Sequence, residues 1–196
     1  MTISRRKVSA KGSAKNTIRA IQTEYAGHWF RSRLEARWAI YLDALGLTWT
    51  YEAEGYAMTY NGQPVNYLPD FWVKEWKCFM EIKGGILRDE DRLKATALAA
   101  MTNKETHGVL MAGGIPEMSD PRSPFVLFTG AADDPQKVAV IPSDQEFKGR
   151  GPTISLKGWR IIINPDIDAP VIKHKDRMMQ ALDKARRARF EHGEKG

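Results

Sequence analysis

Cysteine is nearly absent from this chain of 196 residues, which contains only Cys78. A single cysteine forms no internal disulfide, and the four histidines are too scattered along the sequence for zinc-ligand spacing. No apolar run approaches the roughly 20 residues that span a bilayer, and the basic N-terminal stretch is not followed by the apolar segment of a secretory signal. These absences argue against redox and zinc chemistry and predict a cytoplasmic protein with no membrane partner.

Acidic residues are missing from the first 20 positions, which hold six basic residues. Residues 171–196 hold eight basic and four acidic residues, so the middle of the chain carries a net charge of −4 within a total of +6. Cationic ends favour binding to a polyanion such as DNA, and an acidic centre favours binding of metal cations. The alternative is that both ends are solvated charge without a partner.

Hydrophobic residues make up 42% of the sequence, which is enough to build the core of one domain. The changes in composition along the chain predict four parts. These are a flexible basic arm (1–20), a core (21–112), an additional β-rich part of the same domain (113–170) and a basic C-terminal helix with a tail (171–196).

The core is predicted to begin with a helix, because apolar residues recur at helical spacing from Phe30 to Leu45 and Gly46 supplies a stop. Glu35 lies at the rim of the buried side of this helix. Three neighbouring strands are predicted next, over residues 47–52, 56–60 and 65–68, with Asn61-Gly62 as a hairpin turn.

The stretch from Pro69 to Lys83 places charges among aromatic and aliphatic residues. Pro69 lacks an amide donor, so it indicates a break in strand pairing next to Asp70. Residues 77–83 alternate as a strand, which places Glu81 and Lys83 on one face and Cys78, Met80 and Ile82 on the other. We expect a turn at 74–76 to bring Asp70 close to Glu81.

A helix over 88–101 and a buried strand over 108–112 complete a strand–helix–strand crossover, with Lys94 facing the same cleft as the strand before it. Beyond Gly113 the pattern is weaker. It predicts short strands over 125–129, 138–141 and 159–163, as additional sheet or an appended hairpin region, and a basic helix over 172–191.

The carboxylates of this core suit a hard divalent cation. Asp70 and Glu81 would be its side-chain ligands, the backbone carbonyl of Ile82 would add an oxygen, and Glu35 would complete the site or hold a second ion. Lys83 would orient a water or bind a phosphate. The alternative for each residue is structural, since Glu81 with Lys83, and Glu35 with Arg31 or Arg37, would also form ordinary ion pairs.

The pattern Pro69-Asp70 followed by Glu81-Ile82-Lys83, with Glu35 on the preceding helix, resembles the PD-(D/E)xK nucleases. The flanking stretches Phe30–Asp43 and Trp49–Glu52 resemble the version found in phage-encoded endonucleases, which would place the protein in the cytoplasm of a host cell. The resemblance implies a restriction-endonuclease-like α/β core of order αβββαβ. In such a core a mixed central sheet is flanked by helices.

The resemblance also implies Mg²⁺ or Mn²⁺ dependence and hydrolysis of DNA phosphodiesters. It makes Asp70, Glu81 and Glu35 metal ligands, with the carbonyl of Ile82, and Lys83 the catalytic lysine. The order of motifs is also similar to that of phage Holliday-junction resolvases, so branched DNA and a homodimer are expected. DNA-binding residues are then predicted to be Arg5, Arg6, Lys7, Arg31, Arg33, Lys94, Arg186, Arg187 and Arg189.

Two other functions stay open from the sequence. One is a non-catalytic nucleic-acid-binding protein that retains a nuclease fold, and the other is a structural protein whose basic ends bind a partner. The substrate DNA, the number of metal ions and the choice between internal and terminal cleavage are not encoded in the motif.

Overall fold

The computed structural model describes residues 20–115, 125–130, 136–142, 146–147, 153–163, 171–172 and 175–190. Arg5, Arg6 and Lys7, which were predicted to bind DNA, lie outside the described residues, as does almost all of the predicted arm. No helix in the described part of the chain is long and apolar enough to cross a bilayer.

The described chain is mixed α/β, as predicted. Its helices are α1 (Arg33–Ala44), α2 (Asp89–Met101) and α3 (Lys175–Arg187). The strands of the first part are β1 (Thr23–Tyr25), β2 (His28–Phe30), β3 (Trp49–Tyr51), β4 (Tyr56–Tyr60), β5 (Gln63–Tyr67), β6 (Phe71–Val73), β7 (Cys78–Ile82) and β8 (Gly108–Ala112). Those of the second part are β9 (Phe125–Phe128), β10 (Gln136–Pro142), β11 (Glu146–Phe147), β12 (Thr153–Leu156), β13 (Trp159–Ile163) and β14 (Val171–Ile172).

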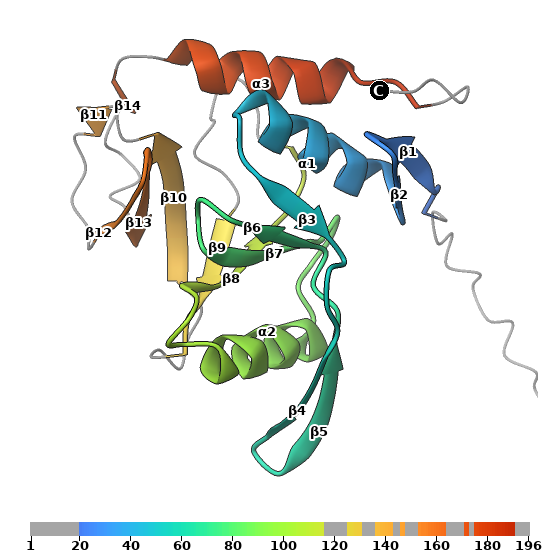
Figure 1. The fold of residues 1–196 in the computed structure, drawn as a ribbon, viewed down its shortest axis with the longest axis vertical. Helices are drawn as coiled ribbons and strands as arrows, with labels where there is room; N and C mark the ends of the chain where they lie inside the picture. Colours follow the sequence, from blue (N-terminus) through green and yellow to red (C-terminus); the bar gives the residue numbers. More distant parts are fainter. Residues whose placement is uncertain are drawn as a thin grey trace, which may run out of the picture.

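One mixed sheet organises the fold, with strand order β12-β13-β10-β9-β8-β7-β6-β3. β7 and β8 pair in parallel and the other neighbours pair antiparallel. Helix α2 connects β7 to β8, as the predicted crossover requires. Helices α1 and α3 cover one face of the sheet, and α2 lies on the other face with the β4–β5 hairpin (Figure 1).

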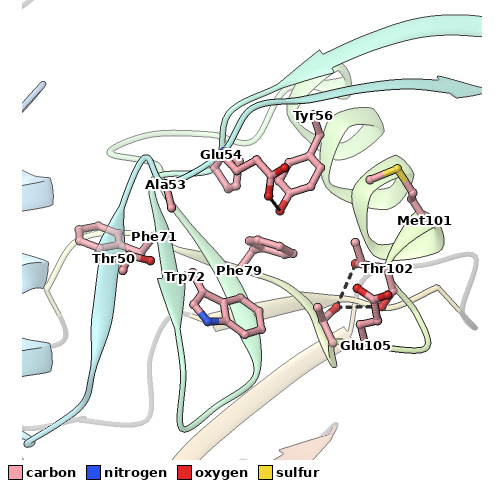
Figure 2. A pocket seen from close by; sticks show the side chains of 12 residues that line it. Thr50, Ala53, Glu54, Tyr56, Phe71, Trp72, Phe79, Met101, Thr102 and Glu105 are labelled. Carbon is pink, nitrogen blue, oxygen red and sulfur yellow. Dashed lines mark hydrogen bonds between the residues drawn. The ribbon is translucent and has the colours of Figure 1, made fainter.

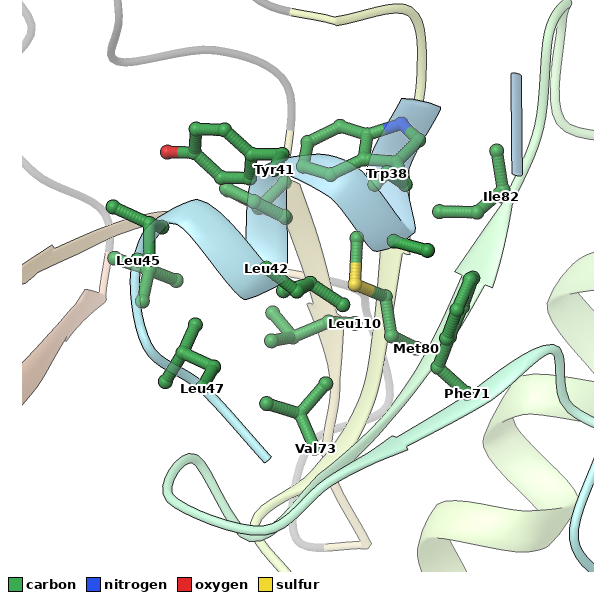
Figure 3. Packing of buried hydrophobic residues seen from close by; sticks show 14 of the residues in the cluster. Trp38, Tyr41, Leu42, Leu45, Leu47, Phe71, Val73, Met80, Ile82 and Leu110 are labelled. Atoms are coloured by element: carbon green, nitrogen blue, oxygen red, sulfur yellow. The ribbon is translucent and has the colours of Figure 1, made fainter. Parts of the chain in front are cut away.

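Helix α1 begins at Ser32, whose hydroxyl accepts a hydrogen bond from the Glu35 backbone N–H, and it ends before Gly46, which has φ +70°. Its apolar side packs on the sheet (Figure 3). Trp38 and Leu42 are fully buried against residues of the central strands such as Met80. The helix therefore fixes one face of β7 and leaves the opposite face for Glu81.

Three predicted neighbouring strands are not neighbours in one sheet, and this expectation was wrong. β4 and β5 pair only with each other, and β3 pairs with β6. Glu52 has φ +45°, so the chain turns out of the main sheet directly after β3. The residues of the hairpin then pack on α2 instead.

The helix start was also placed too early, because Phe30 ends β2 and does not begin α1. Phe30 is buried and contacts the rings of Trp49, Tyr51 and Phe71, so its burial reflects strand packing. The weaker second part joins the main sheet through β9, β10, β13 and β12, which confirms the additional-sheet alternative over a separate hairpin region.

Gly108, at the start of β8, provides a direct test of this packing. Its φ is +116°, and a Cβ built there would lie 1.9 Å from the carbonyl oxygen of Phe128 in β9. We expect Gly108→Ala to lower the free energy of unfolding by about 3 kcal/mol or more, because backbone atoms must move apart. Urea denaturation measures the change. Gly85→Ala is the matched control, since its Cβ would meet nothing within 4 Å, and an equal loss in both variants would contradict this packing.

Candidate active site

In the part of the chain that the structure describes, the buried charged side chains are three carboxylates. Glu35 is 8% exposed, Asp70 3% and Glu81 6%. Burying a carboxylate costs several kcal/mol unless a counter-charge or hydrogen bonds compensate it. All three are residues that the motif singled out, so the fold places its least favourable charges where the sequence predicts a site.

Asp70 and Glu81 come together through the register of β6 and β7. Phe71 pairs with Met80 across these strands, so the next pair along the ladder sets Asp70 opposite Glu81. The backbone N–H of Ile82 donates to Asp70 Oδ2 at 2.7 Å. The predicted turn and strand pairing are confirmed, while the metal-binding role of both carboxylates stays a prediction.

The environment of Asp70 favours its protonated form. Burial, and then the negative charge of Glu81, raise the pKa of Asp70 to about 8, although the Ile82 N–H bond and Arg31 oppose this shift. Arg31 Nη2 lies 2.9 Å from Asp70 Oδ1. The same guanidinium pairs with Glu52 through Nε at 2.5 Å. A further cation at Asp70 would lower its pKa and relieve repulsion from Glu81.

Glu81 and Lys83 form the ion pair expected from their common face, with Lys83 Nζ 2.8 Å from Glu81 Oε1. A second carboxylate, Asp91 in the first turn of α2, lies 3.1 Å from the same Nζ. Burial alone would lower the pKa of Lys83, but the bonds to Glu81 and Asp91 raise it. Lys83 is therefore held as a cation at the mouth of the site.

Tyr67 supports Glu81 from the β4–β5 hairpin. Its hydroxyl donates to Glu81 Oε2 at 3.1 Å, and burial together with the Glu81 charge holds the pKa of Tyr67 well above its usual value. The phenol therefore stays protonated and remains a hydrogen-bond donor. Both oxygens of Glu81 are thus oriented, one by Tyr67 and one by Lys83.

Glu35 is held by donors around the start of α1. Its Oε1 accepts from the Ser32 hydroxyl at 2.6 Å, and its Oε2 accepts from the Tyr51 hydroxyl at 2.6 Å and the Arg31 backbone N–H at 3.1 Å. This arrangement is close to a capping box, in which the third helical residue reaches back to the N-cap. Glu35 contributes to the raised pKa of Asp70, but its own hydrogen bonds come from Arg31 and Ser32 at the start of α1 and from Tyr51 of β3.

Around Glu81 and Lys83 lies a small pocket of about 200 Å³. Its lining combines acids, bases and polar groups from β5, β7 and α2 with an apolar residue of β8. The described lining residues are Arg31, Asn66, Tyr67, Leu68, Glu81, Lys83, Asp91, Lys94 and Met111.

Predicted DNA-binding residues divide into two groups in the structure. Arg31 and Lys94 line the pocket, but Arg31 pairs with acids of the chain and Lys94 pairs with Glu90 at 2.5 Å. Buried Asp70 attracts the guanidinium of Arg31, and the role of Arg31 in DNA binding stays a prediction. Arg33 begins α1, and neither Arg33 nor the residues of α3 line this pocket.

The basic groups of the second set lie in and just after α3. The guanidinium of Arg186 donates to the carbonyl of Ile115 at 3.1 Å, and that of Arg187 to Asp183 at 2.8 Å. Arg189 follows the helix and is exposed. These three arginines form the C-terminal basic group.

Sequence reasoning missed several partners of the carboxylates. Asp91 falls in the helix predicted over 88–101 and Tyr67 in the strand predicted over 65–68, and neither position marks a partner of a carboxylate. Both reach the site through tertiary contacts that no local pattern reveals. Ser32 was detectable, because Ser-x-x-Glu before an apolar helical run is a capping signature and here joins Ser32 to Glu35.

A magnesium ion fits part of this donor set. In the described residues, no three His, Cys, Asp or Glu side chains form a metal-binding group. Mg²⁺ nevertheless needs only one or two protein carboxylates, because it keeps several waters. Asp70 and Glu81 would hold it, with the Ile82 carbonyl as a third oxygen, while the half-exposed Arg31 side chain would move off Asp70.

Comparisons of this chain with protein-family models, with curated proteins and with solved structures find no match.

The raised pKa of Asp70 predicts a pH-dependent stability. Because the folded protein holds the Asp70 proton more tightly than the unfolded chain, stability falls as the pH rises from 3.8 to about 8. Asp70→Asn replaces the carboxyl with a side chain that is uncharged at every pH, so it removes this loss of stability. In EDTA we expect the variant to gain several degrees in Tm over wild type at pH 8, and little at pH 4.

Thermal unfolding at a series of pH values measures this difference. Asp89→Asn removes an exposed carboxylate close to the same region and should show no such trend. A difference between Asp70→Asn and wild type that stays constant across the series would contradict the assigned environment of Asp70.

Proposed function

We propose that this protein is a metal-dependent DNA endonuclease of the PD-(D/E)xK type that hydrolyses phosphodiester bonds. One observation carries the proposal: buried Asp70 stands opposite buried Glu81, with Lys83 paired to Glu81. Burying two adjacent carboxylates costs several kcal/mol even with a lysine beside them, and such costly groups with shifted pKa values cluster at functional sites.

The order of elements supports the same assignment. The chain runs α1, β3, β6, β7, α2, β8, with the β4–β5 hairpin inserted after β3. The order αβββαβ that the family resemblance implies matches this run. Fold order alone does not choose a substrate, so the proposal depends on the carboxylates.

The chemistry follows from the groups that the site brings together. Bound Mg²⁺ would lower the pKa of a coordinated water and neutralise charge that develops on the phosphate. Asp70 and Glu81 would bind the ion from adjacent strands, and Tyr67 keeps Glu81 oriented. Arg31, once off Asp70, would be a cation next to the phosphate.

Lys83 is the proposed catalytic lysine. Its ammonium lies at the rim of the pocket, held by Glu81 and Asp91, and its raised pKa keeps it charged at neutral pH. A cation fixed at this place would bind a phosphate oxygen or orient the water that attacks it. Asp91 then acts as a positioning residue for Lys83.

A second candidate function has its own supporting observation. Arg31 pairs with Asp70, and three donors hold Glu35, so the carboxylates also have partners within the chain. A nucleic-acid-binding protein that has kept this fold without cleaving DNA would have the same contacts. DNA binding without cleavage distinguishes the two.

Cleavage of supercoiled plasmid tests the proposed activity. With Mg²⁺ or Mn²⁺ we expect nicking, which EDTA abolishes. Asp70→Asn should lose at least about 100-fold in rate because a metal ligand is removed, and Lys83→Met should lose about 10²–10⁴-fold. Gel analysis of nicked and linear products gives the rates, and a four-way junction beside a linear duplex shows whether branched DNA is preferred.

Asp89→Asn is the matched control for Asp70→Asn, and Lys74→Ala is the control for Lys83→Met. Each control removes an exposed charge of the same sign as its counterpart, at a residue outside the pocket lining. Both should cut at the wild-type rate. The absence of nicking under every metal condition, or equal rates for Lys83→Met and wild type, would remove the nuclease assignment. Double-strand cleavage would support a homodimer, which sedimentation measures directly.

The C-terminal basic group predicts a salt-dependent contribution to DNA binding. Each phosphate contact adds about 0.9 to the slope of log affinity against log salt. We expect Arg187→Ala/Arg189→Ala to lower that slope by about 2 and to weaken binding to all sequences alike. Lys74→Ala/Lys157→Ala, at two exposed turn lysines, is the control. An unchanged slope in fluorescence-anisotropy titrations would place the DNA elsewhere.

A further inference from the structure

A second and larger pocket of about 630 Å³ lies on the same face of the sheet as Glu81, near the C-terminal end of α2. Trp72 of β6 and Phe79 of β7 pair across the strands and lie two residues from Asp70 and Glu81. The described lining residues are Thr50, Ala53, Glu54, Tyr56, Pro69, Phe71, Trp72, Phe79, Met101, Thr102, Glu105 and Thr106.

Aromatic rings form one wall of this pocket (Figure 2). The ring centroids of Trp72 and Phe79 are 5.0 Å apart, and those of Tyr56 and Phe79 are 5.4 Å apart with the rings nearly perpendicular. Trp72 and Tyr56 are both partly exposed, so aromatic surface faces the open volume. Such faces carry negative electrostatic potential and attract cations.

Negative charge also marks the rim. Glu54 and Glu105 are exposed lining residues, and the described lining contains no Lys, Arg or His. Both acids are near Tyr56: its hydroxyl donates to Glu54 Oε2 at 3.3 Å, and after burial the charges of Glu54 and Glu105 raise its pKa. A chain with net charge +6 thus presents a pocket in which the described charges are all negative.

We infer that this pocket binds an organic cation, an ammonium or guanidinium group on an aliphatic stem. The stem would lie over Trp72 and Phe79, and the charged end would face Glu54 and Glu105. The volume is within the range of small-molecule sites. Two carboxylates would repel a phosphodiester, so the pocket differs in ligand from the proposed nuclease site and does not depend on it.

An ammonium group on an aliphatic stem occurs in free diamines and in lysine side chains. Isothermal titration with 1,5-diaminopentane and with 1,5-pentanediol tests the shared chemistry, since the two probes match in length and differ in charge. We expect the diamine to bind at least tenfold more tightly than the diol, and the preference to shrink at high salt. Nα-acetyl-lysine amide, as a third probe, reports whether a side chain on a peptide backbone fits; tighter binding than the diamine identifies a polypeptide source, and weaker binding a free amine.

Glu54→Gln/Glu105→Gln keeps the shape of the rim and removes its charge. We expect this variant to lose at least tenfold in diamine affinity, with the same melting temperature as wild type. Tyr56→Leu should weaken diamine binding severalfold, whereas Tyr56→Phe retains most of it because the ring face remains. Asp89→Asn, an exposed acid outside the lining, is the control and should bind the diamine normally.

Equal affinity for diamine and diol would show an apolar pocket without charge selection and would overturn the inference. Diamine binding that survives Glu54→Gln/Glu105→Gln unchanged would overturn it as well, as would an absence of binding by both cationic probes. Plasmid nicking by Glu54→Gln/Glu105→Gln should equal that of wild type, so failure of this inference is separable from failure of the nuclease proposal.

Discussion

The burial of Asp70 beside Glu81 is the constraint on which the rest of this structure depends. Two carboxylates on adjacent strands repel each other, and burial raises the pKa of Asp70 to about 8. Nearby groups compensate the charge: Arg31 pairs with Asp70, and Lys83 pairs with Glu81. The carboxylates are therefore already paired with cationic side chains of the same chain, and the proposed Mg²⁺ would join or replace those side chains.

The β4–β5 hairpin links this site to the second pocket. Tyr67 and Tyr56 are cross-strand partners at its base; Tyr67 donates to Glu81, and Tyr56 packs its ring against Phe79. One face of the sheet thus carries a carboxylate site towards the start of α2 and an aromatic pocket towards its end. The two sites lie close together along the strands but differ in charge, because the described lining of the first contains both acids and bases and that of the second contains only acids.

Much of the core was predictable because its signals are local. Periodicity located α1, α2 and β7 to within a few residues, and alternation put Glu81 on the face opposite Met80. The pairing of β3 was not predictable from its neighbours in sequence, because a single residue with positive φ, Glu52, turns the chain away from the expected pairing with β4.

The sequence by itself singled out Asp70, Glu81 and Lys83, which stand at the spacing of the motif, and strand alternation assigns Glu81 and Lys83 to one face. Tertiary structure decided their partners. Asp91 reaches Lys83 only because α2 packs across the sheet. Tyr67 reaches Glu81 only because the β4–β5 hairpin is separate from the main sheet and packs on α2. Side-chain periodicity is a property of a few consecutive residues, whereas charge compensation depends on residues that are distant in the chain and close in space.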